Sequence, residues 1–175
     1  NTAYSRVGGG AVDVAAHMGY PDMEMGAADD KARATRVFGP LGMTETTLDF
    51  KKALAGNYAG TYAYNVDAKV ARVTMDKNRM IIPYRPAGGA WSSAHDMILY
   101  VQDELTKGVL PNGKRLISEA NLMERRKPNI ASGENSLYGM GLETDTQWGV
   151  PVIHHGGSMS GYKSDFLFIP DAQVG

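Results

Sequence analysis

The stretch from Tyr138 to Asp171 constrains the fold more than any other part of the chain. Three segments, "YGMGLETDT", "VPVIHHGG" and "YKSDFLFIPD", are rich in β-branched and aromatic residues and are separated by turn residues. They predict three consecutive antiparallel strands. In the third segment, residues 166–169 are all apolar, so we expect this strand to be covered on both faces.

Helical patterns precede these strands, and the clearest begins at Ser93. Asp96 lies in its first turn, where the helix dipole favours an acid, and Gly108 ends it. The apolar residues that we expect on its buried face are Ile98, Val101 and Leu105. A shorter helix is capped by Ser118, and we interpret "RRK", residues 125–127, as charges suited to its C-terminal end rather than a binding patch.

The earlier part of the chain is less regular. We expect helices over residues 2–18 and 29–38, the second ending at Gly39 and Pro40. Its expected buried residues are Ala34, Val37 and Phe38. Residues 44–65 show no clear period and predict an extended surface excursion, residues 68–75 predict a short strand, and "RPAGGAWSS" predicts a turn-rich approach to the helix after it.

Composition narrows the class of protein. The chain of 175 residues is 43% hydrophobic and 21% charged, as expected for one globular domain of mixed helix and sheet, the α+β class. The formal net charge of -1 speaks against nucleic acid as a partner, and the lack of cysteine excludes disulfides and thiolate metal sites. No apolar run reaches the roughly 18 to 20 residues of a membrane span.

His154 and His155 are the candidate functional residues that stand out. Successive side chains of a strand point to opposite faces, so the two imidazoles should not bind one metal ion together. The other histidines, His17 and His95, lie in expected helices without a metal-binding spacing, so we expect no metal and no cofactor. Gly156 and Gly157 follow directly and would let a substrate approach the backbone N–H groups, which makes the segment suitable for acyl chemistry; an ordinary strand end explains it almost as well.

The segment "HGGSMSGYKSDFLFIPD" resembles the C-terminal motif region of the serine β-lactamase and penicillin-binding-protein superfamily. The resemblance is to the branch of class C β-lactamases, D-alanyl-D-alanine carboxypeptidases and related esterases. Three other segments follow the order of that family, namely "FGPLGMTETTLD", "PAGGAWSSAHDM" and "YGMGLE". The resemblance covers most of residues 30–175 and implies an antiparallel sheet flanked by helices with a helical subdomain beside it. Residues 1–85 would form part of that subdomain and its excursion, and residues 86–175 would form the helices and C-terminal antiparallel strands of the part with the sheet.

The resemblance also implies roles for particular residues. His155, Gly156 and Gly157 would take the place of the family's KTG-like triplet, with histidine in the position of lysine. His155 would contact a substrate carboxylate or a catalytic tyrosine, Gly157 would allow close approach, and the backbone N–H of Ser158 would be one oxyanion donor. Asn1 would be the asparagine of the YxN motif, whose tyrosine would precede Asn1 by two positions.

The sequence departs from the family at the nucleophile. The family's SxxK motif precedes YxN, whereas the match in this chain is "SGYK", Ser160 to Lys163, after the glycine pair. A serine and its lysine partner need one helical face, and positions three apart on a strand face opposite ways. We therefore do not assign Ser160 as the nucleophile. The resemblance makes the chain an internal fragment that needs further segments to complete its fold.

The implied activity is that of a serine hydrolase acting through an acyl-enzyme on an ester, amide, peptide or β-lactam bond. Histidine in the triplet favours ester or peptide hydrolysis over efficient β-lactam turnover. Its partner would be a small-molecule or peptide substrate, and the family favours a periplasmic or extracellular location. A non-catalytic member of the same fold, or an unrelated α+β binding domain, stays open as an alternative.

Overall fold

The computed structural model describes residues 19–175, and for residues 83–86 the backbone alone. The expected helix over residues 2–18 and Asn1 lie outside the described residues. The chain divides into two compact units. The first holds the described residues up to Pro40, Thr44–Ser93 and Ser158–Lys163; the second holds Leu41–Met43, Ala94–Gly157 and Ser164–Gly175.

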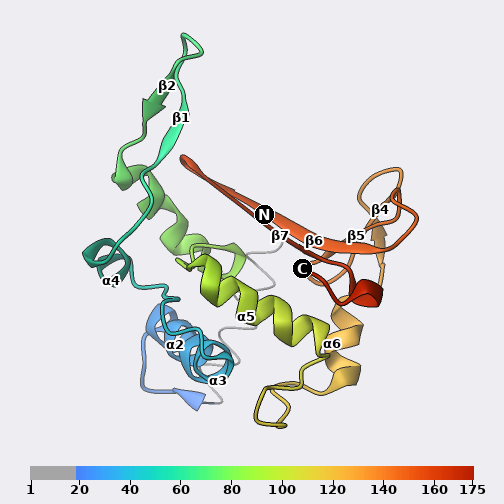
Figure 1. Ribbon diagram of the computed structural model, residues 1–175. Helices are drawn as coiled ribbons and strands as arrows, with labels where there is room; N and C mark the ends of the chain where they lie inside the picture. The colour runs from blue at the N-terminus through green and yellow to red at the C-terminus, as the bar shows by residue number, and fades with distance from the viewer. Residues whose placement is uncertain (1–18) are drawn as a thin grey trace. The chain divides into compact units, whose positions relative to one another are not determined.

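An antiparallel sheet of five strands forms the centre of the second unit (Figure 1). Its strands follow the order of the chain: β3 (Ile130–Ala131), β4 (Ser136–Tyr138), β5 (Glu143–Asp145), β6 (Val152–Met159) and β7 (Tyr162–Phe168). The α+β class and the succession of antiparallel strands are therefore confirmed. A small 3-10 turn, Pro170–Ala172, follows β7.

We expected the segment "YGMGLETDT" to form one strand, and this is wrong. The segment contains the end of β4, a reversal of the chain and β5. Gly141 has a φ of 77° in this reversal, a conformation that glycine adopts without strain. Tyr138 and Glu143 are paired in the resulting register, and Glu143 is paired with His154 on β6. The two glycines of the segment thus mark a turn inside what the sequence pattern presents as a strand.

Helix α5 (Ala94–Leu105) packs on this sheet. Its Val101 forms the core with Leu142, Ile153 and Phe168, each at most 7% exposed. Gly108, with a φ of 83°, ends the segment by donating its N–H to the carbonyl of Asp103. The helix start and end are as expected.

Two expectations about burial in this unit are wrong. Ile98 exposes 55% of its surface, because the buried face of α5 turns Asp96, Asp103 and Glu104 inward instead. Leu167 exposes 49%, so one face of β7 is not covered by the residues that the structure describes. Both errors come from treating apolar character as the sole guide to the buried face.

Helix α6 (Glu119–Arg125) begins as the sequence predicts. The side chain of Ser118 accepts a hydrogen bond from the backbone N–H of Asn121, and Leu122 is buried at 1% exposure. Such a cap is typically worth about 1 kcal/mol. It fixes the start of the helix whose other end adjoins β4.

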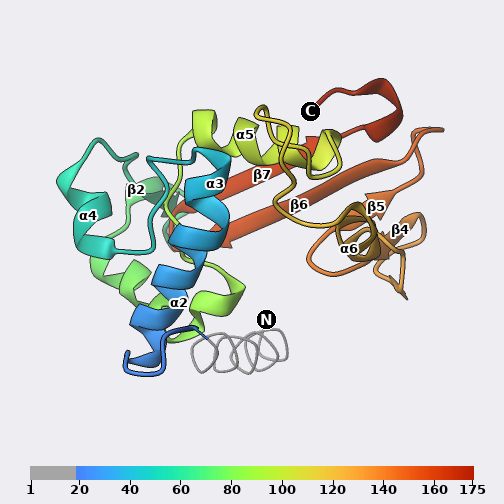
Figure 2. The ribbon, with the colours of Figure 1, turned by 90° about the horizontal axis from the view of Figure 1, so that it is seen from below.

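In the first unit, helix α2 (Met25–Arg33) continues through a π-helical turn, Ala34–Phe38, toward α3 (Gly39–Leu41) (Figure 2). The expected helix end at Phe38 is therefore three residues early, and the expected buried face is wrong. The buried residues are Ala28, Asp29 and Ala32, whereas Val37 is 37% exposed. The wider π turn rotates the side chains after residue 33 relative to an α-helical register, which explains the error.

Residues 44–65 contain a helix that the sequence pattern did not predict, α4 (Phe50–Ala55). Asp49 caps it by accepting hydrogen bonds from the N–H groups of Lys51 and Lys52. Strands β1 (Tyr62–Tyr64) and β2 (Val70–Arg72) follow and form a separate two-stranded antiparallel sheet. Strand β2 lies within residues 68–75, where the sequence predicts a strand. Residues 75–87 form a 3-10 helix that includes the first three residues of "RPAGGAWSS". The rest of that segment, residues 88–93, is irregular, as expected of an approach to the helix after it.

The turn of the β6–β7 hairpin belongs to the first unit and packs tightly there. The side-chain amide of Asn78 donates to the carbonyl of Ser160 at 3.0 Å, and the Tyr162 hydroxyl donates to the carbonyl of Ala59 at 2.8 Å. A Cβ on Gly161 would lie 2.8 Å from the Thr61 side chain. Contacts between segments distant in sequence thus hold this turn in place.

None of the helices in the described part of the chain is long and apolar enough to cross a membrane.

Candidate functional site

His154 and His155 lie in the middle of β6 and contact different partners. His154 Nε2 lies 3.8 Å from a carboxylate oxygen of Glu143, its register partner on β5. His155 Nε2 lies 3.0 Å from the hydroxyl oxygen of Tyr138 on β4. The expectation that the two imidazoles do not share one site is consistent with these separate contacts.

Tyr138 is the residue at this site that sequence reasoning missed. Its ring and the His155 imidazole meet edge to face, with centroids 5.8 Å apart and an interplanar angle of 67°. The two residues are 17 positions apart, and β5 lies between their strands. Only the strand order and the position of the reversal after β4 bring them together, and the sequence pattern placed that reversal inside a strand.

The two glycines after His155 are not equivalent. A Cβ on Gly157 would lie 2.5 Å from the Oγ of Ser164 on β7, so this glycine makes room for a neighbouring side chain. A Cβ on Gly156 would meet nothing closer than 3.8 Å. Packing against Ser164 therefore explains why residue 157 is a glycine. Packing does not explain the glycine at residue 156, which is exposed and has space for a side chain.

The edge of β6 that faces β5 becomes open next to His155. The register between β5 and β6 runs over Val152, Ile153 and His154 and goes no further. Gly156, Gly157 and Ser158 continue β6 and are exposed, without a β5 partner in the described part of the chain. A strand edge of this kind presents backbone N–H and C=O groups to an incoming molecule.

The remaining candidates are placed as follows. Asn1 lies outside the described residues, so its expected role stays a prediction. Ser160 is in the turn between β6 and β7, and Lys163 is on β7. The spacing of "SGYK" therefore falls on a hairpin and not on a helix, in agreement with its rejection as an SxxK nucleophile motif.

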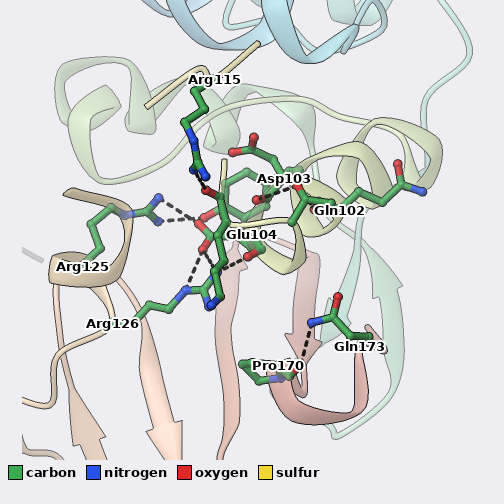
Figure 3. A network of polar contacts seen from close by, with 11 residues as sticks. Gln102, Asp103, Glu104, Arg115, Arg125, Arg126, Pro170 and Gln173 are labelled. Atoms are coloured by element: carbon green, nitrogen blue, oxygen red, sulfur yellow. Dashed lines mark hydrogen bonds and ion pairs between the residues drawn. The ribbon is translucent and has the colours of Figure 1, made fainter. Parts of the chain in front are cut away.

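A buried polar network supports the strand that carries Tyr138. Figure 3 shows Arg125 and Arg126 of the α6 end converging on Glu104 of α5. Arg125 Nη1 lies 2.9 Å from Glu104 Oε1, and Arg126 Nη2 lies 2.9 Å from Glu104 Oε2. Arg126 also donates to the Glu104 carbonyl, and Arg125 Nη2 donates to the Tyr100 hydroxyl at 2.9 Å.

The interpretation of "RRK" as capping charge is therefore wrong for its two arginines. Glu104 is 0% and Arg126 is 7% exposed, so this ion pair lies in the core. Lys127 alone is at the surface, where it pairs with Glu124. Helix-end preference describes exposed charges well, but it does not reveal an acid 22 residues earlier on another helix.

Burial in this network changes the ionisation of two neighbours. It raises the pKa of Tyr100 to about 12, with a further contribution from the negative charge of Glu104. Burial also raises the pKa of Asp103. The negative charge of Glu104 adds to this increase, and the positive charges of Arg125 and Arg126 oppose it. Asp103 Oδ1 is buried and makes no hydrogen bond. Both groups thus favour their neutral forms more than they would in water.

Comparisons with known proteins agree with this fold. A family model described as Beta-lactamase matches residues 30–175, and the chain therefore belongs to the beta-lactamase family. No curated protein matches the chain in a sequence search. The resemblance to β-lactamases and penicillin-binding proteins drawn from the sequence motifs is confirmed.

Solved structures of similar fold include three proteins of this family or of penicillin-binding-protein type, by their descriptions. The octameric penicillin-binding protein homologue from Pyrococcus abyssi has a TM-score of 0.69 at 18% identity, over 83% of this chain and 32% of its own. A penicillin-binding protein from Bacillus halodurans has a TM-score of 0.59 at 19% identity, over 82% and 41%. A class C beta-lactamase mutant has a TM-score of 0.57 at 18% identity, over 85% and 48%. The chain thus spans less than half the length of each, and identities this low support the fold alone.

Proposed function

We propose that the intact protein carrying this chain is a serine hydrolase that works through an acyl-enzyme. The observation that carries the proposal is the His155-Gly156-Gly157 triplet on the open edge of β6, inside the region matched by the Beta-lactamase family model. The substrate would have an ester, amide, peptide or β-lactam carbonyl. The serine would come from a part of the intact protein outside residues 19–175.

In the proposed reaction, the serine oxygen forms a bond to the substrate carbonyl carbon. The bond to the leaving alcohol or amine then breaks, and the proton of the serine passes to that leaving group through a basic partner. Water hydrolyses the resulting ester and releases the acid. The described residues would line one wall of this site and would not carry the covalent chemistry themselves.

The open strand edge suits the charge that develops on the carbonyl oxygen. The backbone N–H of Ser158 follows the exposed glycine pair on β6, where a substrate oxygen could reach it. An oxyanion donor of this kind typically contributes about 3 kcal/mol to the transition state. His155 would bind the carboxylate or carbonyl group of the substrate, and Asn1 would hydrogen-bond its amide.

Histidine in the triplet supports a preference for ester or peptide substrates. Lysine carries a fixed positive charge at neutral pH, whereas histidine does not. A β-lactam with its carboxylate would therefore be bound less firmly by His155 than by lysine. We propose slow acylation by β-lactams without efficient turnover.

Covalent labelling tests the proposal. The intact protein is incubated with a fluorescent fluorophosphonate and, separately, with a fluorescent penicillin, and adducts are measured by mass spectrometry. A single adduct on a serine, together with hydrolysis of a chromogenic ester, is the expected result. Saturable binding without any adduct would instead identify a non-catalytic binding protein, and absence of both would refute the proposed site.

The neighbouring histidines offer a matched pair of variants. His155→Ala should reduce the second-order rate of acylation by about five- to tenfold, since a single lost hydrogen bond to a substrate group is worth roughly 1 to 1.5 kcal/mol. His154→Ala should leave the rate within about twofold, because His154 contacts Glu143 instead. Equal effects of the two variants would contradict the assignment of His155.

A further inference from the structure

The contact between Tyr138 and His155 lies within one unit and one sheet. The Tyr138 hydroxyl oxygen is 3.0 Å from His155 Nε2, a normal hydrogen-bond distance, and both side chains are partly buried. One of the two ring nitrogens of His155 is therefore occupied by a protein partner. The proton position on the imidazole depends on which of the two groups donates.

The backbone around Tyr138 is held on both sides. The carbonyl of Tyr138 accepts a hydrogen bond from Asn129 N–H at 3.0 Å, and the N–H of Gly139 donates to the carbonyl of Leu142 at 2.8 Å. Gly139 lies so close to the end of α6 that a Cβ there would overlap the carbonyl oxygens of Arg125 and Lys127. The backbone at Tyr138 is thus held in place by its neighbours on β3 and at the end of α6.

The end of α6 is itself fixed in the core. The N–H of Met140 donates to the carbonyl of Arg125 at 2.9 Å, and the guanidinium groups of Arg125 and Arg126 are bound to the fully buried carboxylate of Glu104 (Figure 3). A continuous series of contacts therefore runs from α5 through α6 to β4. These contacts fix the strand that carries Tyr138, whose hydroxyl lies 3.0 Å from His155 Nε2 on β6.

The chemistry of the two groups decides the direction of the hydrogen bond. An unprotonated imidazole nitrogen is a much stronger acceptor than a phenol oxygen, and a phenol O–H is a good donor. The favoured arrangement has the Tyr138 hydroxyl donating to Nε2 of His155. The ring proton then resides on Nδ1, whereas a neutral histidine free in water prefers to carry it on Nε2.

We propose that Tyr138 is a positioning residue that fixes His155 as the neutral tautomer protonated on Nδ1. In this form His155 remains a hydrogen-bond donor without a positive charge, at a ring position that Tyr138 does not occupy. Its use in catalysis rests on the proposed function, in which Nδ1–H would donate to an oxygen of the substrate. The tautomer itself is a property of the described residues alone.

Nitrogen NMR tests the tautomer directly. The intact protein is labelled with 15N-histidine and measured at about pH 9, where histidines are neutral. Because the chain has 4 histidines, comparison with His155→Gln assigns the signals. We expect the wild type to show Nδ1 protonated, and Tyr138→Phe to shift His155 toward the form protonated on Nε2.

The matched control is Tyr64→Phe, which removes a hydroxyl from a tyrosine that is 77% exposed in β1. It should leave the His155 signals unchanged. Unchanged His155 signals in folded Tyr138→Phe, or a wild type protonated on Nε2, would overturn the proposal. Circular dichroism and the dispersion of the other histidine signals report whether the variant is folded.

Acylation kinetics test the catalytic consequence separately. Tyr138→Phe should lower the second-order acylation rate by about five- to tenfold, as expected for one misaligned hydrogen bond. A changed tautomer with an unchanged acylation rate would overturn the role of Tyr138 in positioning. If the wild type forms no acyl-enzyme at all, the proposed function fails, while the NMR result still decides the tautomer.

Discussion

Replacing Arg126 by methionine removes the buried partner of Glu104 while keeping much of the volume of the side chain. In the wild type, Arg126 donates to Glu104 Oε2 from Nε at 3.1 Å and from Nη2 at 2.9 Å, and also to the Glu104 carbonyl. Its guanidinium carbon additionally lies 5.0 Å from the centre of the Phe168 ring. The variant loses all of these contacts and leaves a carboxylate in the core.

The expected cost follows from the burial of Glu104. Loss of one partner of a buried ion pair typically costs about 3 to 5 kcal/mol, because the remaining charge is desolvated and unpaired. Arg125 still contacts Glu104 Oε1 at 2.9 Å, which favours the lower end, about 3 kcal/mol. For a chain of this size, that corresponds to a decrease in Tm of roughly 10 °C.

Thermal unfolding followed by circular dichroism measures this effect. Lys127→Met is the matched control: the next residue in sequence, 61% exposed in its side chain and paired with Glu124, should change the stability by less than about 1 kcal/mol. The double variant Glu104→Leu/Arg126→Met should recover part of the loss, because the fully buried carboxylate is gone, while Arg125, 29% exposed in its side chain, still loses its contact with Glu104. The reasoning is refuted if Arg126→Met is no more destabilising than Lys127→Met.

Three further predictions concern the same unit. The raised pKa of Asp103 means that the folded state binds its proton more tightly than the unfolded state, so stability decreases as pH rises from about 4 through that pKa. Asp103→Asn has no carboxyl group to titrate, so its stability relative to the wild type should increase over that pH range and then stay constant. Urea unfolding at several pH values measures this difference in the free energy of unfolding. A difference that does not change with pH would contradict the assignment. Tyr100, with its pKa raised to about 12, should be absent from the main tyrosinate absorbance change near pH 10. Alkaline titration of Tyr100→Phe should lack the late phase, and its persistence there would assign that phase to another tyrosine. Gly139→Ala should cost about 2 kcal/mol or more in urea unfolding, because its Cβ has no space against backbone atoms, whereas Gly133→Ala, with a nearest contact of 3.5 Å, should cost less than about 0.5 kcal/mol.

Local sequence signals predicted the local structure well. Ser118 caps α6 and Gly108 ends the α5 segment, since a capping side chain and a positive φ depend on a few neighbouring residues. The alternation of side chains along a strand also separated His154 from His155 correctly. The cap at Asp49 was present in the sequence as well, but the lack of a clear apolar period around it concealed α4.

Features that depend on distant pairing could not be predicted in this way. Burial of Glu104 becomes favourable only because Arg125 and Arg126 reach it from another helix, and no local pattern distinguishes them from exposed charges. The approach of Tyr138 to His155 likewise depends on where β4 ends and on the strand between them. Composition and spacing therefore could not indicate Tyr138, although it is the residue that contacts the His155 imidazole.

The β6–β7 turn has a consequence for the order in which the molecule folds. Its contacts with Asn78 and Ala59 join residues 82 and 103 positions apart, so the first unit is incomplete until a segment near the C-terminal end has joined it. Closing such long loops costs entropy before any contact is gained, which slows folding. During synthesis on the ribosome, we expect α5 and α6 to form before the β6–β7 hairpin has been made and can pack against the β1–β2 region. The first unit should therefore be the last to reach its final structure.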